Sequence, residues 1–142
     1  MIGRRLLAAI ALLLAVFGGR WVYAARFDDQ ALHVDATVLA RLDALRREPK
    51  FADLPGVPGP RLEAERARNT ANLDGLLDNL RAGIAAHPGK RWVFEQMEPA
   101  IDRMHLEDTE ARERFIDYLV RVDDLLGIAG THGAFAQYLI FF

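Results

Sequence analysis

The sequence has 142 residues, and its 18 lysine and arginine residues against 20 aspartate and glutamate residues give a formal net charge of −2. A nearly neutral chain offers no broad cationic surface to phosphate backbones, so we exclude nucleic acid as a partner. The chain contains no cysteine and no serine, which excludes disulfides, thiolate metal ligands and serine-based catalytic triads.

The N-terminal segment predicts export. Arg4 and Arg5 precede an unbroken apolar run from Leu6 to Phe17. This run is shorter than the roughly 20 residues that a helix needs to cross the hydrocarbon layer of a membrane. Because the arginines precede the run, the rest of the chain is expected to be translocated.

Two interpretations of this segment remain open. Val22 and Ala24 place small side chains where a signal peptidase recognises them, which predicts a signal peptide over 1–24 and a single periplasmic domain over 25–142. Alternatively, residues 6–25 stay uncleaved as an inner-membrane anchor that carries a periplasmic domain.

The mature part is predicted to be all-α, a small bundle of four to five helices, because no stretch alternates with a period of two. The first helix is expected from Asp35, as N-cap, to Glu48, where Pro49 ends it. A proline-rich and glycine-rich loop follows at 51–60. The second helix, expected over 61–86, is apolar only in its second half, so its first half is expected to project into solvent.

The remaining helices are expected over 90–104, over 106–128 and from Thr131 to the aromatic C-terminus. Pro99 is expected to kink or divide the first of these. Asp108, or Thr109 beside it, is expected to cap the second, and Gly127 is expected to end it in the left-handed conformation. The C-terminal helix is expected to pack in the core.

The helix over 106–128 is rich in acids, and its charges fall into two sets. At 100° per residue, five charged residues lie within an arc of about 80° with alternating signs, which predicts a solvated ladder of ion pairs. These are Glu110, Arg114, Asp117, Arg121 and Asp124. Arg112 and Asp123 instead lie in the apolar arc, which predicts buried salt bridges to other elements or a polar pocket floor.

The segments DTEARERFIDYL at 108–119 and DLLGI at 124–128, with Gly133 and an aromatic end, resemble the small bacterial family called domain of unknown function 4844. The sequence departs from the family pattern at 129–132, where Ala-Gly-Thr-His replaces a turn richer in serine and acids. The resemblance implies an all-helical domain, offers no activity to carry over, and favours Asp108, Thr109, Glu110, Arg112 and Glu113 as one unit.

Metal and cofactor binding are not expected. Asp102 and His105 could share one side of a helix, but no Glu-x-x-His motif of a di-iron bundle occurs in the sequence. We therefore expect no catalytic, metal or cofactor-binding residue. A carboxylate-based hydrolase stays open as an alternative, since any acidic helix supplies pairs of carboxylates.

The function that fits these limits is an exported, non-enzymatic binding protein, such as an inhibitor or immunity-type partner of another envelope protein. The alternative is a membrane-anchored accessory subunit of an envelope complex. Around the junction of the third and fourth helices, seven acids outnumber three arginines, which favours a basic partner. They are Glu95, Glu98, Asp102, Glu107, Asp108, Glu110 and Glu113, against Arg103, Arg112 and Arg114. The candidate interface or polar pocket consists of Asp108, Glu110, Arg112, Glu113 and Asp123.

Overall fold

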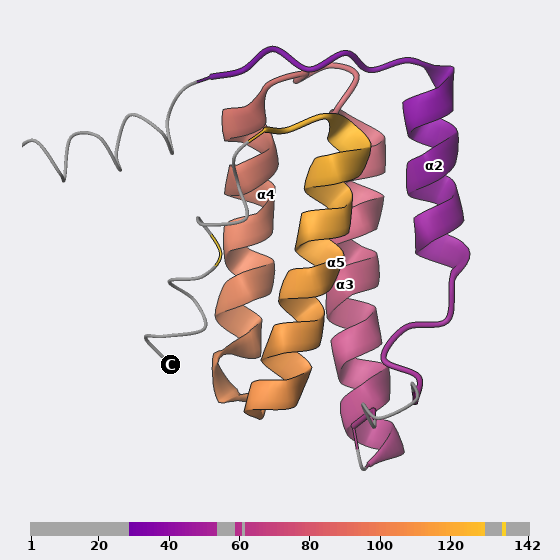
Figure 1. The fold of residues 1–142 in the computed structure, drawn as a ribbon, viewed down its shortest axis with the longest axis vertical. Coiled ribbons are helices and arrows are strands. Elements are labelled where there is room, and N and C mark those ends of the chain that lie inside the picture. Colours follow the sequence, from indigo (N-terminus) through magenta and orange to yellow (C-terminus); the bar gives the residue numbers. More distant parts are fainter. Residues whose placement is uncertain (1–28, 54–58, 61, 130–134, 136–142) are drawn as a thin grey trace, which may run out of the picture.

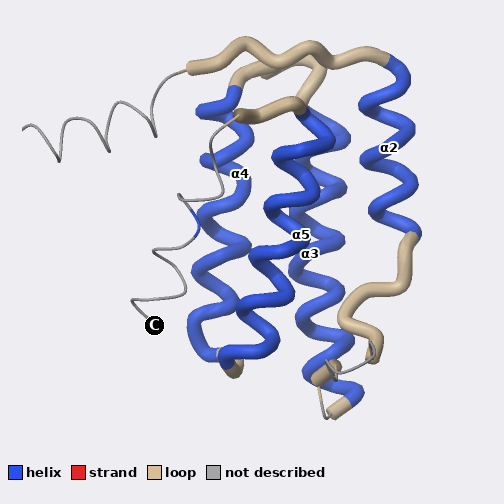
Figure 2. Tube along the Cα trace, in the orientation of Figure 1, coloured by secondary structure: helices blue, strands red, loops and turns tan. Residues whose placement is uncertain are grey.

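The structure, a computed structural model, describes residues 29–53, 59–60, 62–129 and 135. These residues form the helices α2 (Ala36–Arg47), α3 (Glu63–Gly83), α4 (Lys90–Arg103) and α5 (Thr109–Leu126), with a 3-10 turn, η1 (Met104–Leu106), and no strand among them. The four helices run side by side, up and down (Figures 1 and 2), so the predicted all-α bundle is confirmed. None of these helices is long and apolar enough to span a membrane. The predicted signal segment and most of the predicted C-terminal helix lie outside the described residues.

The predicted caps of α2 and α5 are confirmed. The Asp35 carboxylate accepts a hydrogen bond of 2.8 Å from the backbone N–H of Val38, which lowers the pKa of Asp35. The Asp108 carboxylate accepts one of 2.7 Å from the N–H of Ala111 at the start of α5. Gly127 ends α5 with a φ of 69°, a conformation that glycine adopts without the strain of a Cβ.

The core consists of the predicted apolar stripes, and α3 packs between α2 and α4, while α5 packs against α2 and η1. Its fully buried members include Leu42, Leu73, Leu76, Leu77, Leu80, Ile84, Val93, Met97, Phe115, Leu119 and Val122. Phe135 is also buried and lies 5.8 Å from Phe94 between ring centroids. The expected division at Pro99 is wrong, because α4 is one helix through that residue and stays buried on both sides of it, at Met97 and Ala100.

One end of the bundle is tied together by the segment that precedes α2, which runs over the top of the helices in Figure 1. The Leu32 N–H donates to the Pro88 carbonyl at 2.8 Å, and the Lys90 N–H donates to the Gln30 carbonyl at 2.9 Å. The Gln30 side chain also donates to the Gly127 carbonyl at 2.9 Å. We call this the closed end.

A buried ion pair that the sequence did not indicate fixes the chain after α2. The Lys50 Nζ lies 2.8 Å from Asp74 Oδ1, and the Lys50 side chain is only 1% exposed. The same ammonium donates to the carbonyls of Arg46 and Glu48 at 2.7 and 3.0 Å. The pair thereby fixes the chain beside the next residue, Phe51, whose ring contacts Tyr118 of α5.

Candidate functional site

The opposite end of the bundle, where α3 and α5 begin and α4 ends in η1, carries two cavities, and we call it the open end. The first, the α3–η1 groove, has a volume of about 600 Å³ and is lined by Arg68, Asn69, Ala71, Asn72, Gly75, Arg103, Leu106 and Glu107. The second, the Arg114 cavity, has a volume of about 520 Å³ and is lined by Gly59, Pro60, Leu62, Glu65, Asp108, Glu110, Ala111 and Arg114. Leu106, 92% exposed, and Leu62, 60% exposed, are the large hydrophobic side chains that stand in solvent in the described part, and each lines one cavity.

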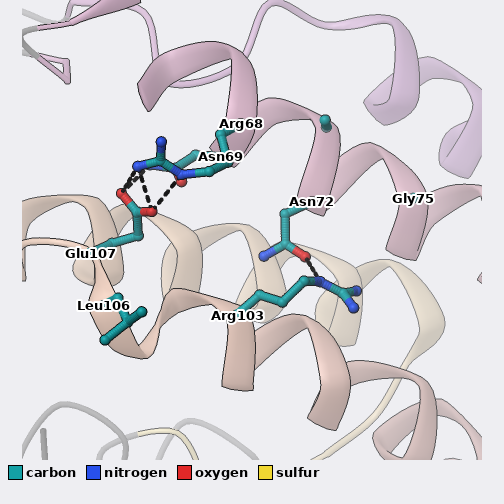
Figure 3. A pocket seen from close by; sticks show the side chains of 8 residues that line it. Arg68, Asn69, Asn72, Gly75, Arg103, Leu106 and Glu107 are labelled. Atoms are coloured by element: carbon teal, nitrogen blue, oxygen red, sulfur yellow. Dashed lines mark hydrogen bonds and ion pairs between the residues drawn. The ribbon is translucent and has the colours of Figure 1, made fainter. Parts of the chain in front are cut away.

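A two-pronged ion pair closes one side of the α3–η1 groove (Figure 3). Arg68 donates from Nε and Nη2 to the two carboxylate oxygens of Glu107 at 2.8 and 3.0 Å, and Asn69 donates to the same carboxylate at 3.4 Å. Paired guanidinium and carboxylate groups of this geometry are directional as well as strong. The residue before Glu107, Leu106, is therefore held on a fixed turn.

Asn72 joins the other side of the groove to the end of α4. Its Nδ2 donates to the Ala100 carbonyl at 2.8 Å, and its Oδ1 accepts from Arg103 Nε at 2.7 Å. Figure 3 shows the rest of the Arg103 guanidinium directed away from Asn72. The groove therefore has a polar wall that is already assembled.

Residues 62–72, the described part of the predicted first half of α3, are mostly exposed, as predicted, but Asn69 and Asn72 depart from that prediction. Asn69 is 1% exposed, and Arg68 is paired with Glu107. The sequence does contain a sign that Asn69 is buried, because Asn69 continues the stripe of Leu73, Leu76 and Leu80 one turn toward the N-terminus. An apolar side chain was expected on that stripe, so the asparagine was missed.

Arg114 lies in the second cavity and corrects the predicted solvated ladder on α5. It is only 8% exposed, its Cζ lies 5.8 Å from the centroid of the Phe51 ring, and its Nη1 is buried without a hydrogen-bond partner. Arg121, another member of the ladder, pairs with Glu48 at 2.7 Å. The segment after α2 covers this edge of α5. A helical wheel of α5 alone cannot predict that covering, because it contains no information about other segments.

Phe51, which lies beneath the Arg114 guanidinium, is held in a strained conformation. Phe51 is fully buried with a φ of 53°, a left-handed value that a non-glycine residue rarely adopts. Its ring lies 5.4 Å from that of Tyr118. A Cβ on Gly59 would stand 2.3 Å from the Phe51 carbonyl oxygen, so only glycine fits there. Strain of this kind is concentrated at functional sites.

The structure divides the predicted site residues. Asp108 caps α5, and Asp108 and Glu110 both line the Arg114 cavity. Arg112 is half-buried and donates to the Thr109 hydroxyl at 3.2 Å, while Glu113 is exposed. The predicted unit therefore occupies the open end, although only two of its members line a cavity.

Asp123 lies apart from this unit, near the closed end of α5. It is 1% exposed, as its place in the apolar arc predicted. Asp108 and Asp123 are 15 positions apart, which corresponds to roughly 22 Å along a helix, so the two carboxylates cannot belong to one site. In the described part of the chain, no group of three or more histidine, aspartate or glutamate side chains is placed to hold a metal ion.

Comparison with known proteins identifies one family. The family model described as "Domain of unknown function (DUF4844)" matches residues 33–142. No curated protein is similar to the chain, and no solved structure is similar to it. The matched range includes both cavities of the open end.

Proposed function

Because the chain belongs to the DUF4844 family, whose description assigns no activity, we propose from its geometry that the domain binds another protein through the open end. The supporting observation is the position of Leu62 and Leu106, which are 60% and 92% exposed and line neighbouring cavities. Single exposed leucines are common on protein surfaces, but two that line the cavities of one end of the bundle favour a contact surface.

Leu106 is suited to act as an anchor. It stands on η1, between α4 and a glutamate that is fixed by two hydrogen bonds to Arg68. Burying an exposed leucine against a partner contributes about 2 kcal/mol, and a turn that is rigid before binding loses little entropy on association. Arg103, in the same groove, already donates to Asn72.

The charges around Leu106 favour a basic partner. Glu107 is neutralised by Arg68, but the acids Asp102, Asp108, Glu110 and Glu113 are exposed. Arg114, which the sequence counted against them, is buried. An acidic surface of this kind is expected of an inhibitor or immunity-type partner of a basic envelope enzyme. The rate at which the two proteins associate should fall as salt screens their charges.

For the location of this binding, we propose export with removal of residues 1–24. The mature protein is expected to begin at Ala25 and to lie in the periplasm of a Gram-negative cell, because a short apolar run precedes the small residues Val22 and Ala24. Intact mass of the protein from a periplasmic extract measures this. A membrane-bound product that retains Met1 would instead support the anchored accessory subunit.

The substitution Leu106→Asp is expected to reduce partner recovery at least about ten-fold in a pulldown read by mass spectrometry, since a buried charge replaces the anchor. Ala85→Asp, an exposed position near the closed end, is the matched control and should leave recovery unchanged. Recovery should also fall between low and moderate salt. The proposal fails if no partner is recovered while the purified protein hydrolyses a cell-wall substrate and loses that activity on Glu110→Gln, the result expected of a carboxylate-based hydrolase.

A further inference from the structure

We propose that the Arg114 cavity binds a small zwitterion, whose carboxylate contacts Arg114 and whose ammonium group contacts Glu65 and Glu110. The ligand class is a free α-amino acid with an aliphatic side chain, because the C-terminal residue of a peptide has an uncharged amide where the free amino acid has its ammonium group. This site goes beyond the proposed protein interface, which is centred on Leu106 in the neighbouring groove.

Arg114 is the group that requires an anion. Arg114 is only 8% exposed. It makes no ion pair with any residue in the described part, and one of its guanidinium nitrogens, Nη1, lacks a hydrogen-bond partner. Other arginines with a carboxylate at 2.7 to 3.5 Å are Arg46, Arg66, Arg68, Arg81 and Arg121. A buried charge without a partner is costly, and a bound carboxylate removes that cost.

The guanidinium is fixed before any ligand arrives. Arg114 lies over the Phe51 ring, which itself contacts Tyr118. The Phe51 N–H also donates to the Tyr118 hydroxyl at 3.3 Å. Arginine placed over an aromatic ring keeps its nitrogens available in the plane of the guanidinium. The ligand carboxylate therefore meets a donor whose position is already determined.

The start of α5 forms another wall of the cavity but contributes little to binding an anion. Asp108 already accepts the hydrogen bond of the Ala111 N–H at 2.7 Å, which satisfies one of the free donors of this helix end and places a negative charge beside it. The carboxylate of the ligand is therefore assigned to Arg114 and not to the helix N-terminus.

The acids of the cavity require a cation on the same ligand. Glu65 is half-buried and Glu110 is exposed, and neither makes an ion pair with a residue of the described part. A simple anion near them would be repelled, whereas an ammonium group a few ångströms from the carboxylate would pair with them. Leu62, Pro60 and Ala111 provide apolar contacts, and a cavity of about 520 Å³ accommodates one aliphatic amino acid.

Calorimetric titration of the purified full chain tests the proposal with three probes. L-leucine is expected to bind, whereas N-acetyl-leucine, which lacks the ammonium group, and leucinamide, which lacks the carboxylate, should each bind at least about ten-fold more weakly. Alanyl-leucine, whose ammonium group lies one residue further from the carboxylate, should also bind at least about ten-fold more weakly than leucine, and equal affinity would overturn the placement of the ammonium group between Glu65 and Glu110.

The variant Arg114→Met should lose leucine binding at least about ten-fold, and its thermal melt should stay unchanged or rise, because an apolar side chain replaces an unpaired buried charge. Arg121→Met, on the same helix but paired with Glu48, is the control that keeps binding. Leu106→Asp should also keep it, which separates this site from the protein interface. If Arg114→Met does not fold, Glu110→Gln decides, with the same expected loss. No saturable heat with leucine up to about 10 mM, or unchanged binding by Arg114→Met or Glu110→Gln, overturns the proposal.

Discussion

The substitution Asp74→Ala is expected to lower the free energy of unfolding by about 3 kcal/mol, because it leaves the Lys50 ammonium buried without its carboxylate. The Lys50 side chain is 1% exposed, and its Nζ lies 2.8 Å from Asp74. Asp74 also lies 2.8 Å from Arg46 Nη1, so one carboxylate serves two cations. Urea unfolding followed by circular dichroism measures the loss.

Asp78→Ala is the matched control for this prediction. Asp78 also pairs with Arg46, at 2.8 Å, but its side chain is 60% exposed, so the loss should be much smaller. The double variant Lys50→Met with Asp74→Ala should recover most of the stability, since apolar groups replace the whole buried pair. Equal losses for Asp74→Ala and Asp78→Ala would contradict the buried pair.

The sequence predicted the helices because their limits depend on local chemistry. A carboxylate that caps the next turn, as at Asp35 and Asp108, and a glycine that adopts a left-handed conformation, as at Gly127, need only neighbouring residues. The stripes of α3, α4 and α5 follow from spacing along one helix. The family resemblance, quoted on residues 108–133, is confirmed over a longer range.

The errors concern contacts between distant elements. A wheel of α5 placed Arg114 in a solvated ladder, but the chain after α2 brings Phe51 beneath its guanidinium. Lys50 and Asp74 lie on different elements, and nothing in either local sequence pairs them. Polar residues that complete a core depend on which segments fold onto it, so the sequence of one helix does not contain that information.

The structure brings together two residues of the predicted interface, whose role stays a prediction. Asp108 and Glu110 pointed to the open end, where both line the Arg114 cavity. These acids were predicted as site residues because a sequence shows directly which residues are charged. Leu106 was not predicted as a site residue. Its side chain is 92% exposed because of the turn between α4 and α5, and the neighbouring residues in the sequence do not predict that turn.

The second large effect is expected for Phe51→Ala, which should destabilise the protein by about 4 kcal/mol in urea unfolding, because a fully buried aromatic side chain is removed. Phe94→Ala is the control, since Phe94 is only partly buried, and its loss should be smaller. If Arg114 depends on this ring for its position, leucine affinity should fall together with stability in Phe51→Ala and stay unchanged in Phe94→Ala. A loss below about 1 kcal/mol, typical of surface substitutions, would show that Phe51 does not hold the structure beneath Arg114.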